Sequence, residues 1–242
     1  MPIRAPWPSG TLAGPRYELK TIVARHPRVA IPIERIRGRG EVTRDNTNVV
    51  IEAFPRSASS FAVAAFRLAQ EPRATRIANH THMPALVIDG VRRGISTLVL
   101  VREAQAAVVS LLIHDPRLPV RSALRGYLRF YEPLVAYRGG FTVGTFEQVT
   151  TDLGSVIRRL NDRSGSSFRA FHHTPENLAR IEREIREDYG SRTRSERHLE
   201  RTIPWPREAR ARIKEEVGER FRREAPPSLL RRADAVARAL TT

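Results

Sequence analysis

The feature that most constrains the fold is the alternation of β-branched runs with amphipathic segments between residues 48 and 175. Residues 49–54 read Val-Val-Ile-Glu-Ala-Phe and end at Pro55, and residues 97–101 read Thr-Leu-Val-Leu-Val. Both runs have the length and composition of buried strands, and each is followed by a segment with helical spacing. Strands that alternate with helices predict an α/β fold with three layers, an open parallel sheet flanked by helices on both faces.

The same patterns divide the chain into an arm and a domain. Residues 1–45 are rich in Pro, Gly and Arg, and we predict an irregular N-terminal arm there. Residues 46–242 are predicted to form one α/β domain, with a helical C-terminal part over 174–242 packed on it. Further strands are expected at 76–81 and 141–146, and helices at 61–70, 85–93, 104–113, 122–137, 152–163, 207–224 and 228–240.

The composition bounds the classes of partner. The formal net charge is +16, and only two of the 42 basic residues, Lys20 and Lys214, are lysine. An arginine skew of this kind is typical of biased genome composition, although it also suits an anionic ligand. The charge is spread along the chain, whereas nucleic-acid binders concentrate it on one element, so no specific nucleic-acid partner is predicted.

Other classes of protein are excluded or disfavoured by what the sequence lacks. There are no cysteines, which excludes disulfides, thiolate metal sites and cysteine nucleophiles. No apolar run approaches the roughly 18 residues of a transmembrane helix, and the first residues lack the apolar core of a secretory signal. These features predict a cytoplasmic protein.

Polar residues mark the ends of the expected strands. Pro55-Arg56-Ser57 follows the first strand, His82 follows the second and Arg102 follows the third. In open parallel sheets, ligands bind outside the carboxyl ends of the strands. We therefore expect these residues to meet along one edge of the sheet.

The segment between the first strand and its helix has the character of a phosphate-binding loop. Small residues that enter a helix present free backbone N–H groups, and the helix dipole favours an anion there. The segment contains no Gly-Lys-Ser or Gly-Lys-Thr and is not a Walker A loop. An ordinary serine-capped helix start is the alternative reading of its residues, which are Arg56, Ser57, Ala58, Ser59, Ser60 and Phe61.

A second basic position lies after the third strand. Ser110 follows Arg102 by eight residues, two turns into the expected helix. A guanidinium group and a hydroxyl at this edge suit a second phosphate. A salt bridge between Arg102 and Glu103, with Ser110 facing solvent, is the alternative.

Together these motifs resemble the sulfotransferase family that uses 3′-phosphoadenosine 5′-phosphosulfate, and bacterial members most of all. The resemblance covers roughly residues 48–175 and keeps the order of the family's motifs. Ala58 stands where the family has glycine, and Arg56 where lysine is frequent. The matching segments are Phe54–Phe61, Thr81-His82-Met83-Pro84, Leu98–Arg102 with Ser110, and Val143–Val149 with Asp152.

The resemblance implies a fold like that of the P-loop nucleotide hydrolases and transfer of a sulfuryl group to a hydroxyl. His82 would be the general base, and Arg56 would neutralise the leaving phosphate. The co-substrate would be held by a C-terminal arginine together with Arg56, Ser57, Ala58, Ser59, Ser60, Phe61, Arg102 and Ser110. Position alone makes Arg194, Arg197 and Arg201 candidates for that arginine, of which Arg197 is taken as the representative. No metal is implied, and the acceptor would be a hydroxyl of a small molecule, a glycan or a lipid.

Several alternatives stay open at this level. In an extended strand His80 and His82 point to the same face, so His80 is a rival base, and the two could also be a metal pair or purely structural. The chain could be a non-catalytic anion-binding or nucleotide-binding module, a degenerate member of the family. It could also be a relative of the P-loop kinases, which depend on magnesium and ATP.

Overall fold

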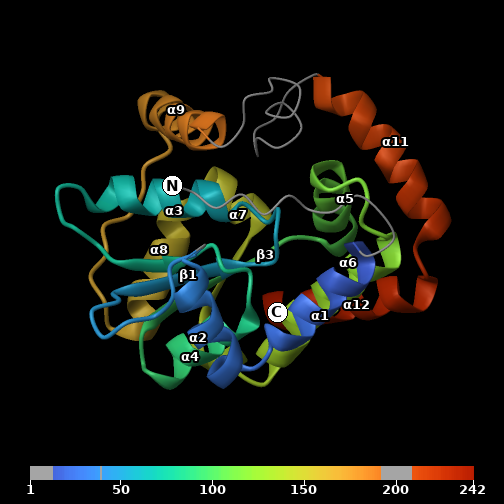
Figure 1. The fold of residues 1–242 in the computed structure, drawn as a ribbon. Helices are drawn as coiled ribbons and strands as arrows, with labels where there is room; N and C mark the ends of the chain where they lie inside the picture. Colours follow the sequence, from blue (N-terminus) through green and yellow to red (C-terminus); the bar gives the residue numbers. More distant parts are fainter. Residues whose placement is uncertain (1–12, 39, 192–208) are drawn as a thin grey trace.

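The computed structural model describes residues 13–38, 40–191 and 209–242, and within them a parallel sheet forms the centre of the fold (Figure 1). Its four strands stand in the order β2-β1-β3-β4. Each pair of neighbouring strands is parallel, which confirms the expected sheet. The strands are β1 (Val49–Ala53), β2 (Ile77–Asn79), β3 (Ser96–Val101) and β4 (Thr142–Thr145).

The strand order places a topological switch point beside β1. The chain passes from β1 to β2 on one side and then to β3 on the other, so the loops after β1 and β3 leave the sheet toward opposite faces. Every residue of β1 and β3 is buried. A crevice suited to ligands is expected at the carboxyl ends of such a pair of strands.

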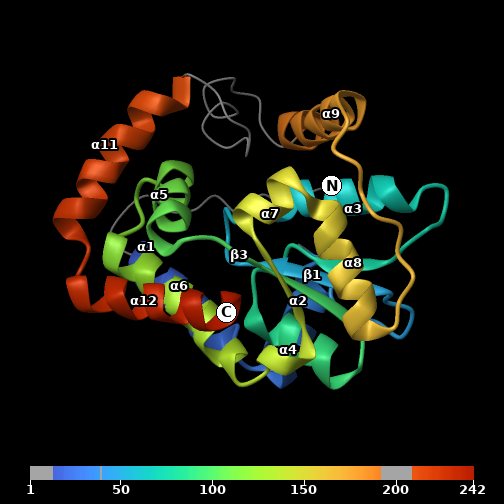
Figure 2. The ribbon, with the colours of Figure 1, turned by 180° about the vertical axis from the view of Figure 1, so that it is seen from behind.

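Helices cover both faces of the sheet and give the three layers that the sequence predicts (Figure 2). On one face, α3 (Ser59–Gln70) and α8 (Leu153–Ser164) pack on Ile51, Leu98 and Leu100. On the other face, the strand residues Val99 and Val101 pack in a cluster with helical side chains. The helices of that cluster are α4 (Pro84–Arg92), α5 (Ala104–His114), α6 (Val120–Val135), α11 (Ala209–Glu224) and α12 (Pro227–Thr241).

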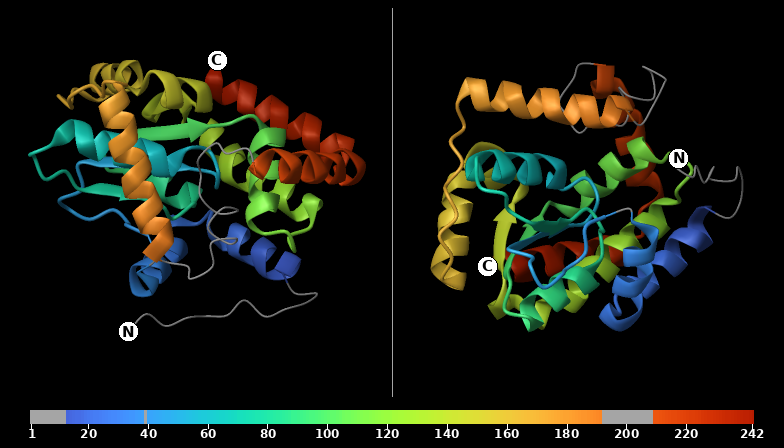
Figure 3. Two further views of the ribbon diagram at one scale, coloured as in Figure 1. Left: turned by 90° about the horizontal axis from the view of Figure 1, so that it is seen from above. Right: turned by 60° about the vertical axis from the view of Figure 1, so that its left-hand side comes forward.

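The predicted C-terminal helices are present and pack on this core. Phe221 of α11 and Leu240 of α12 are buried in the same cluster as α5 and α6. A further helix of this part, α9 (Pro175–Ser191), packs across α3 (Figure 3). In the described part of the chain, no helix has the length and apolar character needed to cross a membrane.

The prediction of an irregular N-terminal arm is wrong for residues 13–37. These residues form α1 (Ala13–Val23) and α2 (Pro27–Arg37). Helix α1 packs on α6, where Glu18 accepts hydrogen bonds from Ser122 at 3.0 Å and Arg125 at 3.1 Å and pairs with Arg129 at 3.0 Å. Partners about a hundred residues away, which the local sequence does not reveal, hold this helix in place.

The strand expected over 141–146 ends earlier in the structure, and a short additional helix separates it from the helix expected over 152–163. The chain turns into α7 (Phe146–Thr151) directly after β4, because Thr145 and Gln148 form a reciprocal capping box. Asp152 then caps the start of α8 by accepting a hydrogen bond from the backbone N–H of Ser155 at 3.1 Å. Helix α7 therefore brings Phe146 to the end of the sheet.

Replacing Glu18 by alanine is expected to loosen α1 from α6. Partial burial raises the pKa of Glu18, but hydrogen bonds from Arg129, Ser122 and Arg125 outweigh it and lower the pKa below its ordinary value. Because the ionised form is favoured in the fold, the loss should be about 1–2 kcal/mol of unfolding free energy near pH 7. The difference should shrink as the pH falls below about 4.

Urea unfolding of the wild type and Glu18→Ala at several pH values measures this effect. Glu219→Ala, which removes an exposed glutamate from α11, is the matched control and should change stability by less than about 0.5 kcal/mol. Equal stability of the wild type and Glu18→Ala at pH 7 would show that the ion pairs do not anchor α1.

Candidate functional site

The loop after β1, residues 54–58, has the features of an anion-binding turn. Arg56 and Ala58 adopt left-handed backbone angles, with φ of 70° and 68°, and Ala58 immediately precedes the first residue of α3. Ser57 is fully buried, and its hydroxyl has no hydrogen-bond partner among the described residues. A buried polar atom without a partner, beside the N-terminus of a twelve-residue helix, fits an anionic group.

Arg102 closes one side of this loop. Its Nη1 donates a hydrogen bond to the carbonyl oxygen of Arg56 at 2.8 Å, and its guanidinium stacks over the ring of Phe146 at 4.0 Å. The hydroxyl of Tyr127 donates to the carbonyl oxygen of Arg102 at 2.7 Å. Both ends of Arg102 are therefore fixed to neighbouring elements.

Arg56 and Ser110 meet in the same place. Nε of Arg56 donates to the hydroxyl of Ser110 at 3.3 Å, so the side chain of Arg56 reaches across to α5. The structure thus brings together Arg56, Arg102 and Ser110, which come from three different segments of the chain. Two guanidinium groups and a hydroxyl at the carboxyl ends of β1 and β3 form a local centre of positive charge.

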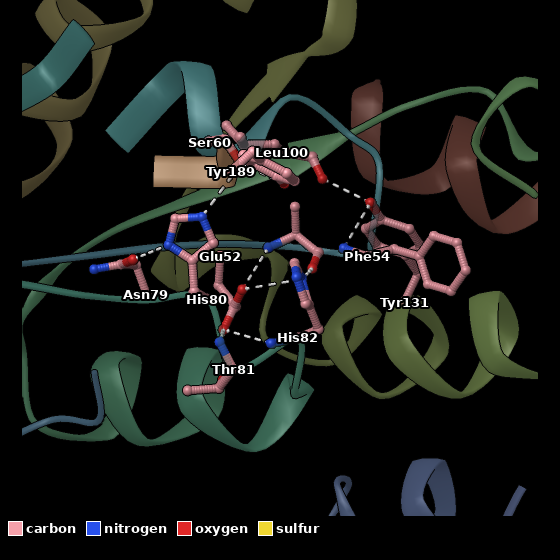
Figure 4. A network of polar contacts seen from close by, with 11 residues as sticks. Glu52, Phe54, Ser60, Asn79, His80, Thr81, His82, Leu100, Tyr131 and Tyr189 are labelled. Carbon is pink, nitrogen blue, oxygen red and sulfur yellow. Dashed lines mark hydrogen bonds and ion pairs between the residues drawn. The ribbon is translucent and has the colours of Figure 1, made fainter. Parts of the chain in front are cut away.

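The other side of the loop is closed by a network around Glu52, a fully buried carboxylate next to the last residue of β1 (Figure 4). Oε2 of Glu52 accepts the backbone N–H groups of Thr81 and His82, each at 3.0 Å, and also the hydroxyl of Thr81. Oε1 accepts the backbone N–H of Ala53 at 3.1 Å. Glu52 thereby binds the segment that carries His82 to β1.

The hydrogen bonds of His82 define its tautomer. Nδ1 lies 2.9 Å from the carbonyl oxygen of Ala53, and because a carbonyl only accepts, Nδ1 carries the proton. The lone pair is then on Nε2. Burial lowers the pKa of His82 below its ordinary value, and the nearby charges of His80, Lys20 and Arg56 lower it further, so the neutral ring is favoured. A neutral imidazole with a lone pair at Nε2 can accept a proton.

His80 has a different environment. Its Nδ1 contacts the side-chain oxygen of Asn79, and its Nε2 lies 3.4 Å from the hydroxyl of Ser60. The expectation that His80 and His82 share one face of an extended strand is wrong, because β2 ends at Asn79 and both histidines have left-handed φ angles, 58° and 53°. The two rings stand at 83° to each other, 6.2 Å apart.

The remaining predicted site residues fall into two groups. Ser59 is buried in the first turn of α3, while Phe61 packs in the core against Phe171 and His173. The three C-terminal candidates, Arg194, Arg197 and Arg201, lie outside the described residues. Among the described residues there is no group of three histidines and acidic side chains able to hold a metal ion.

Comparisons with known proteins find matches among solved structures. No protein-family model and no curated protein matches the chain. Among solved structures, the chain is similar to mouse sulfotransferase SULT7A1 complexed with PAP, with a TM-score of 0.45 and 12% sequence identity. The similarity covers 83% of this chain and 90% of that chain.

Sequence reasoning missed the residues that support the site. The strand pattern over residues 49–54 assigns Glu52 no role of its own, although a carboxylate inside a β-branched, buried run is itself a signal of a buried polar network. The sequence pattern predicts a strand as far as Phe146, whereas this residue, which stacks on Arg102, begins α7. Their partners are distant in sequence, and only the fold brings them together.

Replacing Ala58 by glycine is expected to stabilise the protein. A left-handed φ of 68° costs an L-residue about 1 kcal/mol that glycine does not incur. The free energy of unfolding, measured by urea denaturation, should rise by up to about 1 kcal/mol. Ala69→Gly, in the last turn of the same helix, is the control and should lower it by about 0.5–1 kcal/mol. A destabilised Ala58→Gly would show that the loop is not strained at this position.

The burial of Glu52 predicts a pH dependence of stability. Burial raises the pKa of Glu52 to about 7 despite the hydrogen bonds that it accepts. The folded protein therefore holds a proton that the unfolded chain releases near pH 4.5, and this contribution to stability is lost as the pH rises toward 7. The unfolding free energy of the wild type should fall, relative to that of Glu52→Gln, by roughly 2–3 kcal/mol across this range.

Denaturant unfolding of both proteins between pH 4.5 and 8 tests this prediction. Glu41→Gln, which changes an exposed glutamate outside the network, should follow the wild type at every pH. A difference between the wild type and Glu52→Gln that stays constant with pH would contradict the raised pKa.

Proposed function

We propose that this protein is a sulfotransferase that moves a sulfuryl group from 3′-phosphoadenosine 5′-phosphosulfate to a hydroxyl of its acceptor. The observation that carries the proposal is the bracketing of the β1 loop. His82 is hydrogen-bonded to Ala53 on one side of it, and Arg102 to Arg56 on the other. A proton acceptor and an anion-binding centre thus flank the same helix N-terminus.

The donor would be held by its phosphates. The N–H groups at the start of α3, the hydroxyl of Ser57 and the guanidinium of Arg56 suit the 5′-phosphosulfate. Arg102 and Ser110 suit the 3′-phosphate, the group that distinguishes this donor from ATP. A guanidinium fixed by Phe146 and by the loop carbonyl loses little freedom when it binds a phosphate in bidentate geometry.

The transfer step would use His82 as the base. The acceptor oxygen attacks sulfur, the bond between sulfur and the 5′-phosphate oxygen breaks, and the acceptor proton passes to Nε2 of His82. The leaving group is adenosine 3′,5′-bisphosphate, whose new negative charge would be neutralised by Arg56 and the amides of α3. Protein cations supply this neutralisation, and the proposed step contains no metal.

The acceptor pocket would lie beside His82, near α1. The charge of Lys20 on α1 acts on His82, and the carbonyl oxygen of Ala24 accepts the N–H of Ala85 at 3.1 Å, two residues beyond Met83. Tyr127 and Tyr131 are buried in the core and do not supply this surface. The acceptor class is a hydroxyl of a small molecule, a glycan or a lipid, and a cytoplasmic location remains a prediction of the sequence.

Thermal unfolding with nucleotides tests donor binding. Adenosine 3′,5′-bisphosphate at one hundred times its Kd should raise Tm by about 5–10 °C. The shift should not depend on magnesium, and ATP should give no comparable shift. Arg102→Ala should remove the shift, whereas Arg102→Lys should keep part of it because the charge remains. A Tm shift that appears only with ATP and magnesium would favour a kinase. Equal Tm shifts with any polyanion would favour a general anion-binding module.

Labelled-sulfate transfer to panels of sugars, lipids and phenols then tests turnover. His82→Ala should keep the thermal shift and lower the transfer rate by about 10²–10⁴. His80→Ala is the matched control and should keep the rate within about tenfold, since both nitrogens of His80 contact neighbouring side chains. Donor binding without any transfer would identify a degenerate, non-catalytic member, and full transfer by His82→Ala would contradict the role of this base.

A further inference from the structure

A second basic hollow lies away from the site described above. It has a volume of about 540 Å³, in the range of small-molecule pockets. Its lining comes from the segment before β4, from the start of β4 and from the last two turns of α8. The lining residues are Arg138, Thr142, Val143, Arg159, Asp162 and Arg163.

The hollow lies toward the opposite end of the sheet from His82 and Arg102. Thr142 pairs with Leu98 in β3, whereas the proposed donor site begins at Arg102, four residues further along the strand. At a rise of about 3.3 Å per residue, the two places are about 13 Å apart along β3. The hollow is therefore a separate place and not an extension of the nucleotide site.

Backbone carbonyl groups hold the three guanidinium groups that line this hollow. Nε of Arg138 donates to the carbonyl oxygen of Leu240 at 2.7 Å. Nη2 of Arg159 donates to Val143 at 3.1 Å, and Nη1 of Arg163 to Gly139 at 2.8 Å. A guanidinium has five N–H donors, so each group keeps donors for a ligand after these bonds are made. The cations are fixed in advance, which lowers the entropy cost of binding.

The charge in the hollow is not balanced. Among the described residues, Arg138, Arg159 and Arg163 make no ion pair with a carboxylate, and Asp162 is the sole acidic residue of the lining. Three positive charges and one negative charge leave a net charge of +2. Burial lowers the pKa of Arg138, and the charges of Arg163 and Arg159 lower it further, as expected for cations brought together.

The position of α8 explains part of this arrangement. Arg159 and Arg163 are one turn apart near the C-terminus of the helix, where the helix dipole favours cations. That preference does not account for Arg138, which enters from a different segment and contacts α12 through Leu240. A bound anion would explain why Arg138 converges with the two arginines of α8.

We propose that this hollow is a second binding site, which takes a phosphate or sulfate ester carried by a small molecule. A phosphate monoester is a dianion near neutral pH and matches the net charge of +2, while a sulfate monoester is a monoanion with the same tetrahedral arrangement of oxygens. Guanidinium groups bind both kinds of oxyanion in bidentate geometry. The volume exceeds what a bare ion fills, so the ester's organic part would occupy the rest. The inference does not depend on the nucleotide site.

Calorimetric titration with phenyl phosphate and phenyl sulfate tests the proposal, with inorganic phosphate as the bare ion. The titration is done with excess adenosine 3′,5′-bisphosphate and again in Arg102→Ala, so that the result does not depend on the nucleotide site. The double variant R159Q/R163Q should bind the esters at least tenfold more weakly. R67Q/R223Q, which removes the same charge from exposed arginines elsewhere, should bind like the wild type.

Asp162→Asn gives a test in the opposite direction. Removing the negative charge of the lining should tighten ester binding several-fold, and the exposed position of Asp162 leaves the fold intact. If R163Q alone folds like the wild type and binds the esters more weakly, the weaker binding of R159Q/R163Q is not due to loss of structure. Equal weakening by R159Q/R163Q and R67Q/R223Q, or no ester binding by the wild type, would overturn the proposal.

Discussion

The carboxylate of Glu52 is the interaction on which the geometry of the candidate site depends. Removing an ionised carboxylate from water costs several kcal/mol unless its oxygens are hydrogen-bonded. Here both oxygens accept backbone N–H groups, Oε1 that of Ala53 and Oε2 those of Thr81 and His82. One buried side chain therefore joins β1 to the segment that follows β2. Held there, and next to the β1–β2 ladder that ends at Asn79, the ring of His82 lies within hydrogen-bond distance of the carbonyl oxygen of Ala53.

Backbone strain is concentrated at the same edge of the sheet. Arg56, Ala58, His80 and His82 are the non-glycine residues with left-handed φ angles in the described part of the chain, and all four follow β1 or β2. Each such residue costs about 1–2 kcal/mol, which packing elsewhere must offset. Residues in this conformation are retained where the surrounding contacts require it. Two hydrogen bonds in particular, from His82 to Ala53 and from Arg102 to Arg56, hold the strained turn between them.

The sequence predicted those parts of the structure that follow from local patterns. Strands β1 and β3 and most helices were recognised because their apolar periodicity is strong, and the meeting of Arg56, Arg102 and Ser110 followed from the rule that parallel strands end at one edge. Helix α1 was missed because Glu18 finds its arginine partners on α6, about a hundred residues away. The conformation of His80 and His82 could not be predicted, since Glu52 fixes it through contacts between β1 and a distant loop.

The preference for arginine has a physical use at both ends of the sheet, whatever its origin in base composition. Arg102 donates to a carbonyl oxygen and stacks on Phe146, and Arg138 donates to the carbonyl oxygen of Leu240 while it lines the second hollow. A lysine ammonium has three donors and no planar face, so it could not stack on an aromatic ring in this way and also present a bidentate fork to an oxyanion. Replacing either arginine with lysine therefore keeps the positive charge but removes the fixed orientation of the donors that would bind an oxyanion. The net charge of +16 matters less than the few guanidinium groups that the fold holds in fixed positions.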